Sequence, residues 1–308
     1  MTIRITSQLP DGTEVEVEAE SEDALRALAA NRDNKLCYAA GAAAEVVARR
    51  EWAEAGAARQ LTSVEIAVSV AGLPLGKGLS SSAALCVLVV KALAAAAAVD
   101  WPPTLVMAIA HAGELAAGSP CGLLDQIAPA HGPGAYRVGF GGEGKVTVER
   151  VVVGGQIALV VIDLGAAKDT RAILEGLQQA YPNAQSAADC ALHALLSDKA
   201  RAFVAAAGDA LVGGDARRLG KVLVEAQQAF DEVAIPMVPS ELAAPVLHGL
   251  LTDATVGELV WGGKGVGSQG DGCAQFVARS AEAAEALVTY VGETYPSMSG
   301  LVLCLEAE

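Results

Sequence analysis

The first hundred residues of the chain contain two kinds of hydrophobic pattern: alternation of apolar and polar residues, and a long apolar run. Residues 1–20 alternate between apolar and polar residues around the turn PDG, which predicts a β-hairpin. The segment VEIAVSV, residues 64–70, predicts a strand that leads into a glycine-rich turn. Beyond this turn, residues 83–99 are almost continuously apolar, which predicts a buried helix that ends before two adjacent prolines.

The rest of the chain mixes helical and strand patterns. The further predicted helices cover residues 21–30, 34–54, 104–117, 170–181, 189–207, 215–233, 240–252 and 281–295. The further predicted strands cover residues 135–140, 145–153, 157–163, 257–263, 274–279 and 300–307. Strict βαβ alternation is not present, so the sequence predicts an α+β fold, with domains at residues 1–153 and 154–308.

Composition narrows the class of protein and its partners. Of the 308 residues, 53% are hydrophobic and 19% are charged, so the chain can bury a sizeable core. The net charge of −15 argues against nucleic acid and anionic membranes as partners. The six cysteines are scattered without a C-x-x-C pair, and the N-terminus does not resemble a signal peptide. These features predict a cytoplasmic protein with reduced thiols.

The most informative stretch is PLGKGLSSSAA, residues 74–84, where a glycine-rich turn runs into a helix. Free backbone N–H groups and the positive end of the helix dipole meet at such a start, which favours phosphate binding. The three serines Ser80, Ser81 and Ser82 can cap the helix, contact phosphate oxygens or hold a magnesium ion. An ordinary helix cap is the plainer interpretation of the same serines.

Other motif classes fit poorly. A Walker A loop requires G-x-x-x-x-G-K-[ST], but Gly78 stands where a serine or threonine must follow Lys77. A G-x-G-x-x-G pattern occurs at residues 265–270, but the sequence after it predicts a turn and a strand instead of the helix that a dinucleotide site needs. The serines lack a G-x-S-x-G elbow, which argues against a serine hydrolase.

Two acids follow the serine loop. Glu114 lies near the end of an otherwise apolar predicted helix, and Asp125 lies in the turn after PCG. Either acid alone is compatible with a solvated surface carboxylate. Together with the serine loop, they match the needs of phosphoryl transfer: a phosphate cradle, an oxygen ligand for magnesium and an acid that positions or deprotonates the attacking hydroxyl.

At this point the chain resembles the GHMP kinases, which include galactokinase, homoserine kinase and mevalonate kinase. The stretch PLGKGLSSSA matches every fixed position of their motif P-x-x-x-G-L-x-S-S-A. The segment ELAAGSPCGLLDQ, residues 114–126, is similar to the galactokinase pattern E-x-x-x-G-x-P-C-G-x-x-D-Q, and KGVGSQGDGCA, residues 264–274, resembles the third family motif. The likeness extends from about residue 36 onward.

The resemblance implies an N-terminal α+β domain, a ferredoxin-like C-terminal domain, and phosphoryl transfer from ATP with Mg²⁺ to a sugar hydroxyl. The implied phosphate contacts are Gly76, Lys77, Gly78, Leu79, Ser80, Ser81 and, in a second loop, Gly267, Ser268, Gln269 and Gly270. Ser82 and Glu114 are the implied magnesium ligands, and Asp125 is the implied catalytic residue facing the acceptor hydroxyl. Gly122 and Lys168 are further candidates for contacts to the substrate.

Two departures from the family pattern support an alternative. The segment P-G-R-x-x-x-x-G-E-H-x-D of galactokinases has no counterpart in this sequence. The third motif, usually almost all glycine, contains Ser268, Gln269 and Asp271, and Asp271 brings a negative charge to the expected phosphate region. The alternative is a non-catalytic GHMP-like regulatory protein that binds a nucleotide or a sugar.

Overall fold

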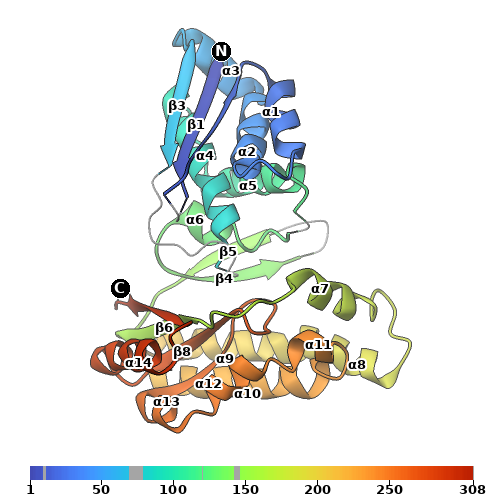
Figure 1. The fold of residues 1–308 in the computed structure, drawn as a ribbon, viewed down its shortest axis with the longest axis vertical. Coiled ribbons are helices and arrows are strands. Elements are labelled where there is room, and N and C mark those ends of the chain that lie inside the picture. Colours follow the sequence, from blue (N-terminus) through green and yellow to red (C-terminus); the bar gives the residue numbers. More distant parts are fainter. Residues whose placement is uncertain (10–11, 69–78, 120, 142–145, 308) are drawn as a thin grey trace. The chain divides into compact units, whose positions relative to one another are not determined.

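The computed structural model describes residues 1–9, 12–68, 79–119, 121–141 and 146–307. The chain folds into two compact units, Met1–Pro133 and Gly134–Glu308. Each unit mixes helices with a sheet, as Figure 1 shows, which confirms the predicted α+β class. The boundary expected between residues 153 and 154 stays a prediction; the hairpin before that point packs as part of the second unit.

Unit 1, residues 1–133, contains a three-stranded sheet with strand order β2-β1-β3. The strands are β1 (Thr2–Gln8), β2 (Glu14–Ala19) and β3 (Ser63–Val68). β1 pairs antiparallel with β2, which confirms the predicted hairpin, and parallel with β3. Ile3 and Ile5 of β1 are buried because alternate residues of a strand share one face.

The helices of unit 1 pack against this sheet and against one another (Figure 1). They are α1 (Glu22–Ala30), α2 (Cys37–Val47), α3 (Arg50–Ala58), α4 (Ser81–Ala97), α5 (Pro103–Ala116) and α6 (Ile127–His131). A Cβ on Gly41 of α2 would lie 2.2 Å from the carbonyl oxygen of Gly113 in α5. Only glycine therefore permits this close helix crossing, which fixes the helix that carries Glu114.

The single helix predicted over residues 34–54 is wrong, because the chain breaks between α2 and α3. Arg49 has an extended backbone, with φ −84° and ψ 128°, and the chain changes direction there. The break lets Trp52 of α3 donate from Nε1 to the carbonyl oxygen of Leu93 in α4 over 2.7 Å. Apolar periodicity alone continues across residues 48–49 and does not reveal this break.

Unit 2, residues 134–308, contains a four-stranded antiparallel sheet with strand order β7-β8-β6-β9. The strands are β6 (Ile157–Asp163), β7 (Val260–Gly265), β8 (Cys273–Ala278) and β9 (Ser299–Leu305), and α14 (Ala281–Thr294) connects the last two. If β6, β7, β8 and β9 are numbered 1 to 4, their order across the sheet is 2-3-1-4. Helices connect strand 1 to strand 2 and strand 3 to strand 4. This is the β-α-β-β-α-β order of a ferredoxin-like sheet, which confirms that expectation.

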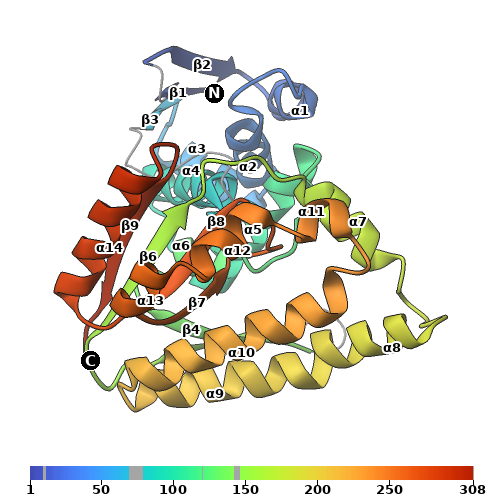
Figure 2. The same cartoon turned by 60° about the horizontal axis from the view of Figure 1, so that its bottom comes forward.

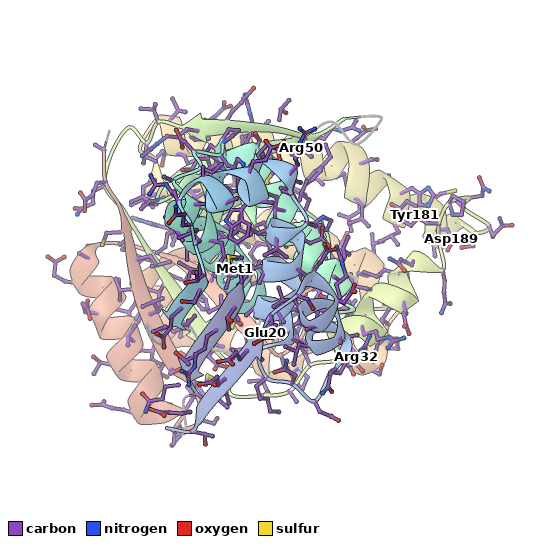
Figure 3. The ribbon with its side chains drawn as sticks, turned by 90° about the horizontal axis from the view of Figure 1, so that it is seen from above. Met1, Glu20, Arg32, Arg50, Tyr181 and Asp189 are labelled. Atoms are coloured by element: carbon purple, nitrogen blue, oxygen red, sulfur yellow. The ribbon has the colours of Figure 1, made fainter. Side chains whose placement is uncertain are left out.

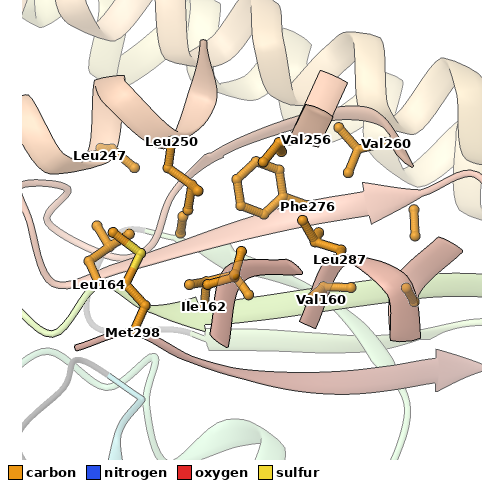
Figure 4. Packing of buried hydrophobic residues seen from close by; sticks show 14 of the residues in the cluster. Val160, Ile162, Leu164, Leu247, Leu250, Val256, Val260, Phe276, Leu287 and Met298 are labelled. Atoms are coloured by element: carbon orange, nitrogen blue, oxygen red, sulfur yellow. The ribbon is translucent and has the colours of Figure 1, made fainter. Parts of the chain in front are cut away.

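The main core of unit 2 lies between this sheet and its helices (Figure 4). Phe276 of β8 is 1% exposed and belongs to one cluster with Ile162 of β6 and Leu287 of α14. Leu247 and Leu250 of α12 belong to the same cluster. This packing fixes the ends of β7 and β8, and hence the glycine-rich loop between them.

The remaining elements of unit 2 form a hairpin and a long helical connection (Figure 2). They are β4 (Ala135–Phe140), β5 (Val146–Val151), α7 (Thr170–Gln178), α8 (Ala187–Ala194), the π-helical segment η2 (Leu195–Lys199), α9 (Ala200–Val212), α10 (Ala216–Ala234), α11 (Pro239–Leu242), α12 (Pro245–Leu251) and α13 (Ala254–Leu259). Tyr181, labelled in Figure 3, lies in the connection between α7 and α8, and Asp189 lies in the first turn of α8. In the described part of the chain, no helix is both long and apolar enough to cross a membrane.

The strand predicted over residues 257–263 is wrong in its first half. Residues 257–259 belong to α13, and β7 begins only at Val260. Asp253 caps α13 by accepting a hydrogen bond from the backbone N–H of Val256 over 3.0 Å. This cap stabilises a short helix within a sequence that also suits a strand.

Candidate functional site

The helix that follows the serine loop begins with backbone donors that no side chain of its N-cap residue satisfies. Ser80 has a left-handed backbone, with φ 58° and ψ 35°, and α4 starts at Ser81. The Ser80 side chain makes no capping hydrogen bond, so the first N–H groups of a 17-residue helix stay available to a ligand. Leu79, Ser80, Ser81 and Ser82 are half-buried. Gly76, Lys77 and Gly78, also predicted to contact phosphate, lie outside the described residues.

Ser82 and Glu114 meet although 32 residues separate them in the sequence. The Ser82 hydroxyl donates to Oε1 of Glu114 over 2.6 Å. Ser82 lies in the first turn of α4, and Glu114 lies in the last turn of α5, which packs against α4. Glu114 is 2% exposed, so the interpretation as a solvated surface carboxylate is wrong. The structure thus joins the serine loop to the first of the two acids.

Gln126 is a third member of this group that the sequence analysis missed. Its Nε2 donates to Oε2 of Glu114 over 2.6 Å, and the residue is 0% exposed. Its Oε1 is buried without a hydrogen-bond partner among the described residues. The position directly after Asp125 was the available signal, but nothing in a single sequence indicates that this amide turns inward.

Among the described residues, no positive charge compensates the Glu114 carboxylate. Within the described residues, no lysine or arginine forms an ion pair with this carboxylate. Burial raises the pKa of the Cys121 thiol, and the negative charge of Glu114 raises it further. The same two causes raise the pKa of Cys86. This part of unit 1 is therefore a buried region of negative potential that favours a bound cation.

The oxygen donors around Glu114 suit Mg²⁺. They comprise the Glu114 carboxylate and the Ser82 hydroxyl, and the amide oxygen of Gln126, unpartnered among the described residues, belongs to the same group. Hard cations such as Mg²⁺ prefer oxygen ligands and are commonly held by one or two carboxylates together with phosphates and water. Among the described residues, no group of three His, Cys, Asp or Glu side chains could hold a metal by itself. The residues present therefore fit a magnesium ion that also binds a phosphate, better than a metal held by protein alone.

Asp125 and Gly122 lie on the exposed turn that leads into α6. Both residues are exposed, whereas the neighbouring Gln126 is buried. The start of this connection is anchored at Gly118, where φ is 78° and where a guanidinium N–H of Arg32 (Figure 3) donates to the carbonyl oxygen over 3.0 Å. Asp125 is therefore exposed to solvent directly next in sequence to Gln126, which contacts Glu114.

The third glycine-rich segment forms the loop between β7 and β8 in unit 2. Gly267, Gln269 and Gly270 have left-handed backbones, with φ of 60°, 68° and 72°. Successive backbone N–H groups near such residues can surround an anion. A strand follows this loop, so the rejection of a dinucleotide fingerprint at residues 265–270 is confirmed.

Two lysines lie against this loop without a carboxylate partner among the described residues. Lys168 donates from Nζ to the carbonyl oxygen of Gln269 over 3.1 Å, and Lys264 donates from Nζ to that of Gly265 over 2.6 Å. Burial lowers the pKa of Lys168 and lowers that of Lys264 to about 8. An anion bound near this loop would relieve both unfavourable positive charges.

Asp271 has a structural partner that the sequence did not reveal. Its Oδ1 accepts a hydrogen bond from the backbone N–H of Leu247 over 2.8 Å. Leu247 lies in the first turn of α12, whose N-cap residue is Ala244, which has no side-chain acceptor. Asp271 therefore caps α12 from a distance, and its negative charge is stabilised by a helix N-terminus.

A hydrogen-bonded chain connects the same loop to two helices. The Gly265 N–H donates to Oε1 of Gln227 over 2.8 Å, and Nε2 of Gln227 donates to Oδ1 of Asp231 over 2.7 Å. His248 of α12 places Nε2 3.1 Å from Oδ2 of Asp231 and Nδ1 2.9 Å from the carbonyl oxygen of Ala244. Although partial burial opposes the charge, the Asp231 carboxylate and the backbone carbonyls raise the pKa of His248. Both ring nitrogens face acceptors, so the protonated ring satisfies both contacts.

The structure thus gathers the predicted site residues into two groups. Ser82 and Glu114 are joined in unit 1, close in sequence to Ser80, Ser81 and Asp125. Lys168 and Gln269 are joined in unit 2, where Ser268 Oγ lies 3.5 Å from Oγ1 of Thr170. The roles assigned to these residues remain predictions.

Comparisons with known proteins concern the N-terminal unit and the fold. Residues 38–133 match the family model described as the GHMP kinases N terminal domain. No curated protein is significantly similar in sequence.

Several solved structures share the fold. Lactococcus lactis galactokinase complexed with galactose has a TM-score of 0.64 and 15% identity, over 99% of this chain and 82% of that one. Streptococcus pneumoniae phosphomevalonate kinase in complex with phosphomevalonate and AMPPNP has a TM-score of 0.67 and 15% identity, over 99% and 87%. L. major mevalonate kinase in complex with R-mevalonate has a TM-score of 0.62 and 16% identity, over 86% and 77%.

Proposed function

The chain has the GHMP kinase fold, with a GHMP kinase N-terminal domain in residues 38–133, and on this premise we propose that it is an ATP-dependent small-molecule kinase. It transfers the γ-phosphoryl group of ATP to a hydroxyl group of its substrate. The observation that carries the proposal is the 2.6 Å hydrogen bond between Ser82 and Glu114, which joins a helix N-terminus to a buried carboxylate. Phosphoryl transfer depends on positioning and on charge neutralisation, and these two features serve both needs.

In this proposal the start of α4 binds the phosphates of ATP. The N–H groups at Ser81 and Ser82 and the helix dipole favour the negative charge, and the glycines and Lys77 before them complete the cradle. Ser82 and Glu114 hold Mg²⁺, and Gln126 lies beside them. When bound, Mg²⁺ neutralises charge on the phosphate oxygens and orients them. The short Ser82–Glu114 contact keeps both ligands together beforehand.

Asp125 is the proposed catalytic residue. Its exposed carboxylate accepts the proton of the substrate hydroxyl or holds that hydroxyl for attack. The loop at residues 267–270 and the ammonium group of Lys168 provide contacts to phosphate or substrate, and the missing carboxylate partner of Lys168 among the described residues supports this role.

The proposed substrate is a sugar. The support is the local likeness of residues 114–126 to the galactokinase pattern, together with the shared fold of galactokinase. The structural neighbours also include kinases named for mevalonate, phosphomevalonate and homoserine, so these acceptors define the competing substrate classes.

The test measures ADP release with ATP, Mg²⁺ and a panel of sugars, mevalonate, phosphomevalonate and homoserine. We expect turnover with one of the sugars and a loss of about 10²–10⁴-fold in kcat for Asp125→Asn, with little change in the KM for ATP. The matched control is Asp100→Asn, an exposed aspartate of the same unit, which should retain full activity. Equal ADP release by the wild type and Asp125→Asn with every acceptor would refute the role of Asp125.

The alternative function is a regulatory protein that binds a nucleotide or a sugar without turnover. The altered third motif, with Ser268 and Gln269 in place of glycines, is the observation that favours it. Nucleotide binding by calorimetry without ADP release in the presence of any acceptor would support this alternative over the kinase.

A further inference from the structure

Gln126 is fully buried beside Glu114 but has no role in the function proposed above. It is 0% exposed, whereas its chain neighbour Asp125 is exposed. A buried amide destabilises the fold unless its donors and its acceptor are hydrogen-bonded. The burial of the Gln126 amide therefore needs a physical explanation, which its contacts provide.

The orientation of the Gln126 amide is set by Glu114. The NH₂ group faces the carboxylate and donates to Oε2 over 2.6 Å. The flipped amide would place its oxygen against the carboxylate oxygen, which repels it. The atom that remains unpartnered among the described residues is consequently Oε1, an acceptor that can take a hydrogen bond from a bound water molecule or ligand.

Gln126 and Ser82 hold the two oxygens of Glu114 from different sides. Oε1 accepts from Ser82 and Oε2 accepts from Gln126, so the carboxylate cannot rotate without losing a hydrogen bond. A lysine in place of Gln126 would neutralise Glu114 and compete with a metal ion. A neutral amide orients the carboxylate and leaves its negative charge uncompensated.

We propose that Gln126 is a positioning residue that orients the Glu114 carboxylate for a divalent cation. Its Oε1 accepts a hydrogen bond from a water molecule in the hydration shell of that cation. Mg²⁺ usually keeps several of its waters, and residues that hydrogen-bond to metal ligands tune affinity by orienting them. This inference rests on the proposed function, since it takes Glu114 to be a metal ligand.

The experiment titrates Mn²⁺, followed by electron paramagnetic resonance, into the full-length protein saturated with a non-hydrolysable ATP analogue. We expect Gln126→Leu to weaken Mn²⁺ binding by about 10–100-fold. The control Gln179→Leu, at an exposed position in the other unit, should bind Mn²⁺ as the wild type does. If Gln126→Leu binds Mn²⁺ as tightly as the wild type, the inference is overturned.

A second variant covers the case in which Gln126→Leu does not fold. Gln126→Glu keeps the size of the side chain but sets two carboxylates against each other, which then retain a proton in the absence of metal. Its Mn²⁺ affinity should rise with pH between about 6 and 8 far more steeply than that of the wild type. A wild-type pH dependence in this variant would count against the inference.

The wild-type titration separates failure of the inference from failure of the proposed function. If the wild type binds neither the ATP analogue nor Mn²⁺, the proposed kinase is wrong and the inference falls with it. If the wild type binds both and the Gln126 variants are unaffected, the kinase proposal stands and only the role of Gln126 is refuted.

Discussion

The serine–acid group of unit 1 and the glycine-rich loop of unit 2 carry charges of opposite sign that have no ion-pair partner among the described residues. In unit 1, the Glu114 carboxylate is 2% exposed and is held only by neutral donors among the described residues. In unit 2, Lys168 and Lys264 donate to backbone carbonyl oxygens, and neither forms an ion pair in the described part of the chain. Each region carries a charge that is unfavourable without a ligand.

The opposite signs of these charges indicate that the two regions suit ligands of opposite charge. A buried carboxylate without a cation suits a metal ion, whereas half-buried ammonium groups beside left-handed backbone suit an anion. The support also differs: unit 1 relies on a helix terminus and two side-chain contacts, and unit 2 relies on a loop fastened by Gln227 and Asp271. Four predictions test this contrast.

The largest expected effect is that of Glu114→Gln. Loss of the proposed metal ligand should lower kcat by about 10²–10³-fold, because charge on the transferred phosphoryl group is then less well stabilised. Since the charge of Glu114 contributes to the raised pKa of Cys121, that pKa should fall in the variant. ADP release and the pH dependence of thiol alkylation measure the two effects. Full activity in this variant, with the exposed Glu51→Gln as control, would remove Glu114 from the site.

Lys264→Met tests the opposite charge in unit 2. The pKa of Lys264 is lowered from 10.5 to about 8, so the protonated lysine destabilises the fold below pH 8. Wild-type stability should therefore rise between about pH 8 and 10.5, where the unfolded chain binds the extra proton, and this rise should be absent in the variant. At pH 7 the variant should gain up to about 2 kcal/mol while nucleotide or substrate binding weakens about 10-fold. Urea unfolding between pH 7 and 10 and calorimetry test this; a variant that loses stability contradicts it.

Asp271→Ala separates the two interpretations of this residue. As a cap of α12, Asp271 should contribute about 1 kcal/mol to the free energy of unfolding. Asp271→Asn keeps a capping oxygen and removes the charge, so it should retain most of this stability. Denaturant unfolding of both variants measures the difference. Equal losses in the two variants would show that the charge matters more than the cap.

The smallest expected effect concerns His248. The raised pKa of His248 means that its stabilising contribution is complete below about pH 6.5 and is lost as the pH rises through the folded-state value. Because the side chain is 30% exposed, the contribution should stay below about 1 kcal/mol. Unfolding at pH 5.5 and 8.5 should show this loss in the wild type and not in His248→Gln. An unchanged pH dependence in the variant would refute the link to His248.

Much of the local structure was predictable because it depends on short patterns. The alternation of apolar and polar residues in residues 1–20 predicted the hairpin, and Gly118 ends the helix of Glu114 as expected of a C′ glycine. The glycine-rich turn before three serines located the start of α4. The predicted helix over residues 34–54 failed because its break depends on Trp52 reaching α4, which periodicity does not encode.

The contacts that the site residues make could not be predicted from the sequence. In the sequence Glu114 was compatible with a solvated surface acid, and only its 2% exposure in the folded chain excludes that interpretation. Gln126 was visible only as the last residue of the matched segment 114–126, which does not indicate that its amide is buried. Asp271 appeared unfavourable until its hydrogen bond to the backbone of Leu247 assigned it a capping role. Each of these contacts joins residues more than ten positions apart, so a local pattern carries no information on it.

The sequence by itself determined the α+β class, the serine-rich helix start and the likeness to the GHMP kinases, because these reside in periodicity and in short motifs. The tertiary structure decided which polar side chains are buried and what they contact. Burial makes the charges of Glu114 and Lys264 unfavourable in the absence of a ligand, and burial arises only when distant segments pack together. The sequence identified candidate residues for the proposed chemistry. Their burial and their contacts, on which that chemistry depends, arise from long-range packing.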